Sequence, residues 1–276
     1  KESFHEIIDS CYWPILDAVK NFNFKTGIEF PVNTLKKIET IDPLFIEELR
    51  DLIKRKKCEF IFSGQEQIVS PLVPKEINEQ NLITGFKEIQ RIFRVRPDIA
   101  YVHEQIFSNG LIPIYLRTKF KNIMIIYETA SQTWNLKRKQ DFSPMKIKSN
   151  GDKLNVIWNS RNAYQTFQKY VNGKTKKQEY LDFILKNKKK EDTCFPFYGS
   201  DMEIFNYKNP VLRLKGNRDG VKRFYDILDE INKCNELDFI LPSDLMNIFP
   251  PSETIKICSA KYPILGKKEE SIVTRW

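Results

Sequence analysis

The feature that most constrains this fold is the alternation of short apolar segments with longer amphipathic ones. Short apolar runs bounded by Gly, Pro or Asn are typical of buried strands, whereas apolar residues three and four positions apart are typical of helices. The predicted strands are 27–30, 58–63, 98–104, 122–127, 154–158, one within 193–204, and 238–241. The predicted helices are 3–20, 43–57, 77–95, 111–119, 162–170, 178–186 and 220–233. The alternation predicts an α/β fold of parallel strands joined by crossover helices, either a barrel or a doubly wound sheet.

Turn and capping residues set several of these boundaries. Asp42 and Pro43 suit the N-cap and the first position of the helix that follows them. Gly64 ends the second predicted strand. Residues 129–152 and 206–217 are polar and lack periodicity, so we expect both segments to be loops.

Length and composition limit the class of protein. The 276 residues suit a single α/β barrel, which typically takes about 250. The net charge is +9, but the positive residues are spread along the chain without an aromatic-interleaved basic motif. We therefore expect no nucleic-acid partner. No apolar run approaches the roughly 18 residues of a membrane span, so we expect a cytoplasmic protein without a membrane partner.

The cysteines and histidines argue against a disulfide framework or a metal site. None of the five cysteines forms a CxxC pair, so buried free thiols in a reducing compartment are expected. The only histidines are His5 and His103, too few for the usual zinc ligand sets. No cofactor is predicted.

Carboxylates follow the predicted strands. In parallel α/β folds, functional groups lie beyond the carboxyl ends of the strands. The acids in these places are Glu29, Glu66, Glu104, Glu128, Asp201, Glu203 and Asp244. Some such acids serve as helix N-caps, which is the interpretation that we favour for Asp244. Their concentration at strand ends of a positively charged chain indicates an acidic functional site.

Glu104 is the strongest candidate for catalysis. Side chains alternate along a strand, so Ala100, Val102 and Glu104 would share one face. Two small apolar residues followed by a carboxylate suit an inward face that opens into a pocket. The alternative is an exposed acid in a loop.

Asp201 is the second candidate. If residues 197–203 form a strand, Phe197, Gly199, Asp201 and Glu203 share one face, and Gly199 leaves room for a ligand. Two acids on one face repel each other and raise one pKa, which suits a proton donor near neutral pH. Cleavage of a glycosidic bond needs two carboxyl groups, one as nucleophile or base and the other as proton donor.

Aromatic rings could supply the flat apolar surface of a sugar site. Tyr127 and Trp158 lie at the ends of predicted strands, and Trp134 lies in a predicted loop. Each of these rings could pack in the core instead.

The order of the motifs resembles glycoside hydrolase family 57 and its close relatives. Segments 27–31 and 59–64, followed by a proline loop at 71–74, precede a strand that ends in His103-Glu104-Gln105. In the family, the catalytic Glu occupies this place.

The later motif of that family has a catalytic Asp after an apolar strand and a Glu two residues further on, and segment 197–203 matches it. The resemblance implies an incomplete TIM-like (β/α)7 barrel that acts on α-glucans and related glycosides with retention and without a metal. It implies that Glu104 is the nucleophile and Asp201 the general acid/base. The predicted substrate-binding residues are Glu66, His103, Gln105, Tyr127, Trp134, Trp158 and Glu203.

The chain departs from the family pattern in three respects. The family's first strand, with its active-site His, is expected before residue 1. Val102 and His103 stand where the family usually has Trp or Pro. The helical region that follows the barrel is expected after Trp276. We therefore expect residues 1–276 to form a single catalytic barrel domain that lacks those two parts.

Two other functions stay open. One is a non-catalytic barrel that binds a glycan or a protein partner, because fold does not fix function. The other is a metal-dependent enzyme of the polysaccharide deacetylase type. Its need for His and Asp ligands argues against it in a chain with two histidines.

Overall fold

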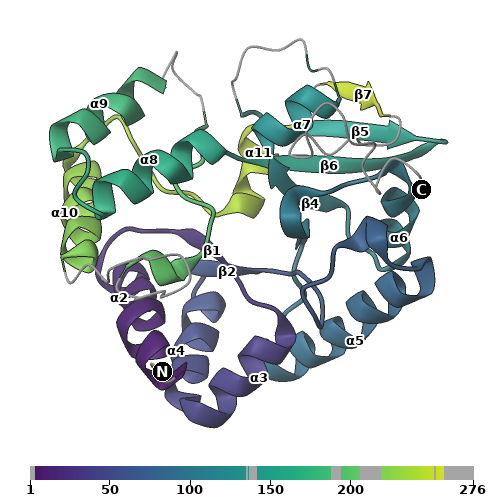
Figure 1. Cartoon of the computed structure of the whole chain (residues 1–276), viewed down its shortest axis with the longest axis horizontal. Helices are drawn as coiled ribbons and strands as arrows, with labels where there is room; N and C mark the ends of the chain where they lie inside the picture. Colours follow the sequence, from purple (N-terminus) through teal and green to yellow (C-terminus); the bar gives the residue numbers. More distant parts are fainter. Residues whose placement is uncertain are drawn as a thin grey trace. The chain divides into compact units, whose positions relative to one another are not determined.

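The chain divides into two compact units. The computed structural model describes residues 4–134, 136, 142–187, 194–205, 219–251 and 253–257. The first unit comprises Lys1–Thr26, Lys36–Glu59 and Arg161–Leu241, and the second comprises Gly27–Leu35, Phe60–Ser160 and Pro242–Trp276. The first unit is mainly helical, whereas the second holds the larger sheet (Figure 1). The prediction of a single barrel domain stays a prediction.

The helices of the first unit follow the predicted pattern. They are α1 (Phe4–Ile7), α2 (Trp13–Asn21), α4 (Pro43–Lys54), α8 (Arg161–Val171), α9 (Lys177–Asn187) and α10 (Gly220–Lys233). The helix predicted over 3–20 contains a π-helical turn, Ile8–Tyr12, between α1 and α2. The predicted N-cap of α4 is confirmed, because the Asp42 carboxylate accepts a hydrogen bond from the Phe45 backbone N–H at 3.2 Å.

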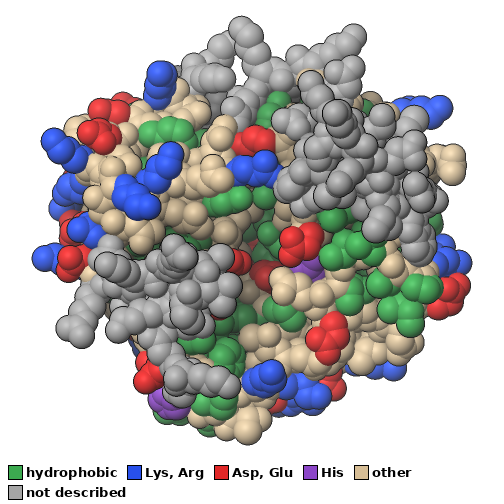
Figure 2. Space-filling model, in the orientation of Figure 1, with side chains coloured by type: hydrophobic (Ala, Val, Ile, Leu, Met, Phe, Trp, Pro, Cys, Tyr) green, Lys and Arg blue, Asp and Glu red, His purple; other side chains and the backbone are tan. Residues whose placement is uncertain are grey.

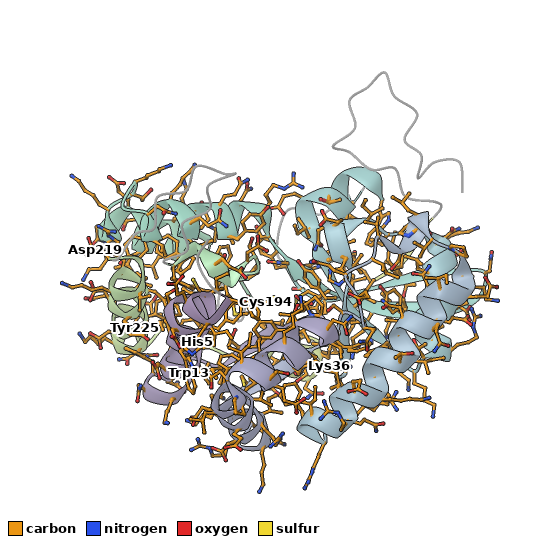
Figure 3. All side chains as sticks on the ribbon, turned by 60° about the horizontal axis from the view of Figure 1, so that its bottom comes forward. His5, Trp13, Lys36, Cys194, Asp219 and Tyr225 are labelled. Carbon is orange, nitrogen blue, oxygen red and sulfur yellow. The ribbon has the colours of Figure 1, made fainter. Side chains whose placement is uncertain are left out.

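An aromatic core holds the first unit together. Phe167 of α8 is fully buried, and its ring centroid lies 4.9–6.2 Å from those of Tyr180, Phe197, Tyr198, Phe205 and Phe224. Trp13 and Tyr225, two aromatic residues labelled in Figure 3, have polar ends that find partners within this unit. The Trp13 indole N–H donates to Asp42 at 2.7 Å, and the Tyr225 hydroxyl donates to a backbone carbonyl of α2 at 3.1 Å.

The elements of the second unit include most of the strands. They are β1 (Thr26–Glu29), β2 (Cys58–Ile61), α5 (Lys75–Phe93), β3 (Ile99–Tyr101), α6 (Ile112–Arg117), β4 (Asn122–Ile126), α7 (Tyr127–Thr133), β5 (Met145–Ser149), β6 (Asp152–Asn159), α11 (Leu245–Ile248) and β7 (Thr254–Lys256). Helix α3 (Val32–Ile41) contributes residues to both units. The first residues of β1 and β2 belong to the first unit, and their last residues belong to the second.

The sheet order brings successive strand ends together. β1 pairs with β2, and a five-stranded sheet has the order β3-β4-β6-β5-β7 (Figure 1). β3, β4 and β6 are parallel, and a parallel bridge joins Phe62, just after β2, to Ala100 of β3. The parallel arrangement that the sequence predicts is therefore confirmed for this part of the sheet. The carboxyl ends of these strands lie along one edge, where parallel α/β folds carry their functional groups.

Apolar side chains from the strands and α11 form a core on this sheet. Ile61, Ile99 and Ile157 are buried, and Leu245 and Met246 pack against them. Because these residues come from β2, β3, β6 and α11, burial of their side chains fixes the strand order.

Several predicted elements were wrong. Residues 194–201 and 238–241 form no strand, and the loop predicted over 129–152 instead contains α7 and β5. β5 pairs antiparallel with β6 through a turn at Asn150 and Gly151, which interrupts the parallel pattern. Helix α3 and strand β7 were not predicted. The predicted loop at 206–217 lies outside the described residues.

The described surface carries charges of both signs, and the described cysteines are buried or partly buried. Lys and Arg side chains are interspersed with Asp and Glu on the described surface in Figure 2. Cys11 and Cys58 are buried as predicted, whereas Cys194 and Cys234 are only partly buried. Burial raises the pKa of Cys58 to about 12. Within the described residues, no helix has both the length and the hydrophobicity that crossing a bilayer requires.

Candidate functional site

Polar side chains gather at the carboxyl ends of the strands in the second unit. Glu29 ends β1, and Ser63 follows β2 after one further residue. Glu128 follows β4 in the first turn of α7, and Ser160 follows β6 directly. Glu104 lies just beyond β3. The concentration of acids that the sequence predicts is thus present at this edge.

Two of the strand-end acids are held by serines from the next strand. The Ser63 hydroxyl donates a hydrogen bond to the Glu29 carboxylate. The Ser160 hydroxyl donates to the Glu128 carboxylate at 2.7 Å. Both serines are buried, so each hydrogen bond to a carboxylate forms away from bulk water, where such bonds are strong. These two carboxylates therefore have fixed positions at the edge of the sheet.

Glu104 is presented by a turn rather than by a strand. The predicted strand over 98–104 was too long, because β3 ends at Tyr101 and residues 103–105 form a turn. Glu104 has φ 52° and ψ 9°, and Gln105 has φ 59°. The side chain of Glu104 is exposed. The face shared by Ala100 and Val102 therefore does not continue to Glu104, which faces solvent from a left-handed backbone.

His103, just before Glu104, is buried and electrically neutral near pH 7. It is 6% exposed, and the edge of its ring packs against Tyr101, with ring centroids 5.8 Å apart. Burial lowers the pKa of His103 to about 4, and the nearby Ser63 backbone opposes part of this shift. Neither ring nitrogen of His103 has a partner within hydrogen-bond geometry among the described residues, and this includes the Ser63 backbone. His103 therefore carries unused hydrogen-bonding groups next to the candidate nucleophile.

Gln105, in contrast, uses its amide within the protein. It is 8% exposed. Its amide nitrogen donates to the Val102 carbonyl at 3.0 Å, and its amide oxygen accepts from the Ile126 N–H at 2.6 Å. Both ends of this buried amide are bonded to backbone, and its contact with substrate stays a prediction.

Glu66 lies on a short loop that is tightly held. Gly64 begins the loop with φ 107°, a conformation that favours glycine. The Glu66 N–H donates to the Asn81 side-chain oxygen at 2.8 Å, and the Asn81 amide donates to the Glu66 carbonyl at 3.1 Å. The Asn33 amide donates to the Glu66 carboxylate and accepts from the Gln65 amide. The exposed Glu66 carboxylate therefore projects from a fixed backbone.

The three predicted aromatic contacts form a buried cluster. Tyr127, Trp134 and Trp158 are 8%, 9% and 4% exposed. The Trp158 ring lies 5.4 Å from Tyr127 and 6.2 Å from Trp134, measured between centroids. The Trp158 indole N–H donates to a backbone carbonyl at 2.9 Å. This packing favours the core interpretation that the sequence left open, and sugar binding by these rings stays a prediction.

Asp201 and Glu203 lie in the first unit, ahead of and within the 3₁₀ turn Met202–Ile204. The Tyr198 hydroxyl donates to the Asp201 carbonyl at 2.5 Å, and the Asp201 side chain is exposed. The Glu203 carboxylate accepts a hydrogen bond from the Tyr12 hydroxyl at 2.6 Å. Because residues 194–201 form no strand, the predicted alternation of faces here was wrong, and Glu203 is turned toward Tyr12.

The second unit thus brings Glu29, Glu66, Glu104 and Glu128 onto one set of strand ends, whereas Asp201 and Glu203 belong to the first unit. The pairing of Glu104 with Asp201 stays a prediction. The sequence did not reveal Tyr12 and Asn81 as partners, because each lies within a predicted helix. It did not reveal Asn33 either, which lies in the unpredicted helix α3. Ser63 and Ser160 could have been found, since Ser63 ends one predicted strand and Ser160 lies two residues beyond another.

The arrangement offers hydrogen-bonding carboxylates and no evident metal ligand set. In the described part of the chain, no group of three or more His, Cys, Asp or Glu residues could hold a metal ion. Exposed or serine-held carboxylates accept hydrogen bonds from hydroxyl groups. The chemistry of this edge therefore suits a ligand rich in hydroxyl groups.

Comparisons with known proteins agree with this chemistry. A family model described as glycosyl hydrolase family 57 matches residues 1–258. An alpha-amylase from Pyrococcus furiosus is 31% identical over 74 residues, which is 26% of this chain and 11% of that protein.

Two solved structures show the same fold. A 4-alpha-glucanotransferase from Thermococcus litoralis aligns with a TM-score of 0.78 and 17% identity over 94% of this chain and 39% of that one. A branching enzyme from Pyrococcus horikoshii aligns with a TM-score of 0.66 and 12% identity over 92% of this chain and 68% of that one. This chain therefore spans only a part of each of these relatives.

Proposed function

Because the chain belongs to glycosyl hydrolase family 57, we propose that it carries the catalytic part of a retaining glycoside hydrolase or transglycosylase that acts on α-glucans. The observation that carries the proposal is the position of Glu104. It is an exposed carboxylate on a left-handed turn at the carboxyl end of β3, within an edge rich in acids. Left-handed backbone at a non-glycine residue is costly and is concentrated at active sites.

The proposed reaction uses two carboxyl groups in turn. The Glu104 carboxylate attacks the anomeric carbon while the Asp201 carboxylic acid protonates the departing glycosidic oxygen. A covalent glycosyl-enzyme forms as the glycosidic bond breaks. Asp201, now a carboxylate, takes a proton from water or from a sugar hydroxyl, whose oxygen attacks the same carbon and releases Glu104. Because each of the two steps inverts the configuration at the anomeric carbon, the product keeps the original configuration.

The surroundings of Asp201 support its role as the acid/base. Its backbone carbonyl is bonded to Tyr198, and the turn that follows is tied to Tyr12 through Glu203. A carboxyl group that shuttles a proton needs a fixed backbone and an accessible side chain, and Asp201 has both. The accessible carboxylate of Glu66 is proposed to bind sugar hydroxyl groups.

The proposal includes the architecture of the family. Parallel β3, β4 and β6, extended by the bridge from Phe62 to Ala100, are proposed to form part of an incomplete (β/α)7 barrel. The likeness to the glucanotransferase and to the branching enzyme supports this. Residues 1–276 are then proposed to form one catalytic domain.

The test compares three variants on two substrates, a maltooligosaccharide and α-glucosyl fluoride. Glu104→Gln is expected to lower turnover on both substrates by on the order of 10⁴-fold, because the nucleophile is lost. Asp201→Asn is expected to lower turnover on the maltooligosaccharide far more than on the fluoride, since fluoride leaves with little help from an acid. Glu76→Gln removes an exposed carboxyl on α5 and should change neither rate.

Normal turnover of Glu104→Gln on both substrates would refute the assignment of the nucleophile. Binding of the maltooligosaccharide by the unaltered chain, with no product from either substrate, would instead favour the non-catalytic barrel. Equal losses of Asp201→Asn on both substrates would contradict its role as the acid.

A further inference from the structure

The side chain of Gln105 ties the turn that presents Glu104 to the neighbouring strand. We propose that Gln105 is a positioning residue, which acts by holding the Glu104 carboxylate in the geometry needed for attack. The inference rests on the proposed function, in which Glu104 is the nucleophile. It differs from the sequence prediction, which placed Gln105 in contact with substrate.

The turn needs a restraint because its backbone is unfavourable. Glu104 and Gln105 are consecutive residues with φ of 52° and 59°. A left-handed conformation is unfavourable for a residue with a β-carbon, because that carbon comes too close to the following carbonyl oxygen. Two such residues in succession would relax toward the ordinary helical or extended regions unless other contacts hold them. Relaxation would swing the Glu104 side chain away from its present direction.

The Gln105 amide supplies that restraint at two points. Its nitrogen donates to the Val102 carbonyl at 3.0 Å, which closes the turn onto the end of β3. Its oxygen accepts from the Ile126 N–H at 2.6 Å, at the last residue of β4. β3 and β4 are already joined by the Val102 N–H, which donates to the Met124 carbonyl at 3.1 Å. The amide therefore continues the pairing of these strands one step beyond β3.

Burial makes both bonds matter. Gln105 and Val102 are buried, and Ile126 is 6% exposed. A buried backbone N–H left without a partner is costly, because its lost hydration is no longer offset by a hydrogen bond. Without the amide, the Ile126 N–H would lose its bond to Gln105, and the chain would have to move the turn or admit water to satisfy it. The Val102 carbonyl would keep the bond from the Gln105 backbone N–H at 3.2 Å but would lose the second one. An apolar side chain of the same size would fill the space but would not hold the turn.

The uncharged character of the side chain also fits the role. Glutamate has the same shape and would keep an acceptor for the Ile126 N–H, but it would lose the donor to Val102. It would also place a second carboxylate next to Glu104, where like charges disfavour ionisation. Gln105→Met and Gln105→Glu therefore separate the loss of both hydrogen bonds from the loss of one and the gain of a charge.

The experiment measures kcat and KM for a maltooligosaccharide, with Gln80→Met as the matched control. Gln80 is an exposed glutamine on α5 of the same unit. Gln105→Met is expected to lower kcat by about 10- to 100-fold with KM within about twofold, because a misplacement near 1 Å costs about that much. Gln105→Glu is expected to recover part of kcat and to move the acidic limb of the pH profile to higher pH. Gln80→Met should leave kcat and KM unchanged.

Two results would overturn the positioning role. One is unchanged kcat in Gln105→Met. The other is a loss in KM alone, which would indicate direct contact with substrate. If Gln105→Met does not fold, Gln105→Glu decides: an unshifted pH profile with the kcat of the unaltered chain refutes the inference. Failure of the proposed function is distinct, because it appears as normal turnover in Glu104→Gln.

Discussion

Replacing Gly85 by alanine tests how the loop of Glu66 is held. Gly85 lies within α5, where alanine is normally better than glycine by about 1 kcal/mol. In this structure, a β-carbon on Gly85 would lie 2.5 Å from the Gln65 nitrogen and 2.7 Å from the Gly64 carbonyl carbon. Both contacts are to backbone, which cannot rotate away as a side chain can. Helix propensity therefore predicts that Gly85→Ala stabilises the protein, whereas packing predicts that it destabilises the protein.

The cost in packing is larger than the gain in helix propensity. Forcing an extra methyl group into a well-packed site costs about 1–3 kcal/mol. The displaced loop also strains the bond from the Gln65 N–H to the Asn81 carbonyl at 3.1 Å and the bond from the Glu66 N–H to the Asn81 side chain at 2.8 Å. Each such bond contributes about 1 kcal/mol. After subtracting the gain in helix propensity, we expect Gly85→Ala to lower the free energy of unfolding by about 2 kcal/mol.

Urea unfolding followed by tryptophan fluorescence measures this effect, because Trp134 and Trp158 lie in the same unit as Gly85. Lys87→Ala on the exposed side of α5 is the control and should stay within about 0.5 kcal/mol. Asn81→Ala should be less than additive with Gly85→Ala, since both act on the same loop. An increase in stability on Gly85→Ala would refute the reasoning, because helix propensity would then be the only term in effect.

Two further substitutions test His103, the residue before Glu104, and the buried aromatic cluster of Tyr127, Trp134 and Trp158. The pKa of His103 is lowered from 6.5 to about 4, so its neutral form stabilises the fold above pH 6.5, and that contribution is lost as pH falls from 6.5 to 4. Because of His103, the free energy of unfolding should fall by roughly 3 kcal/mol between pH 6.5 and pH 4, and His103→Gln should remove that fall. A difference in unfolding free energy between the two proteins that stays constant with pH would contradict this expectation. Trp158→Ala should lower the free energy of unfolding by about 3–5 kcal/mol, as for a core aromatic residue. If Trp158 instead binds sugar, the variant will raise KM and leave urea unfolding nearly unchanged.

The sequence was sufficient for most of the helices and for the parallel strands β3, β4 and β6, because both follow from local patterns. Helices α4, α5, α8 and α10 have apolar residues at helical spacing, and their burial follows from that spacing. The acid just beyond β3 could also be found, since strand ends mark the functional edge of parallel sheets. The direction of its side chain could not, because a left-handed turn leaves no periodic signal.

The failed strand over 193–204 shows what local patterns miss. Phe197 and Tyr198 pack against Phe167 of α8 from an irregular segment. Adjacent residues in a strand point to opposite faces, yet here both neighbours contact the same ring. Aromatic residues are common in strands and in cores alike, so tertiary packing rather than strand propensity decided this segment.

The paired carboxylates at the strand ends suggest why their partners are serines. Glu29 accepts from Ser63, and Glu128 accepts from Ser160, in each case across two neighbouring strand ends. A hydroxyl group can donate to a carboxylate without bringing a positive charge, so the edge stays acidic while each carboxylate is held. A lysine or arginine in the same place would neutralise the acid and fill the space above it. Carboxylates held by hydroxyl donors at these two strand ends therefore suit a site for neutral, hydroxyl-rich ligands.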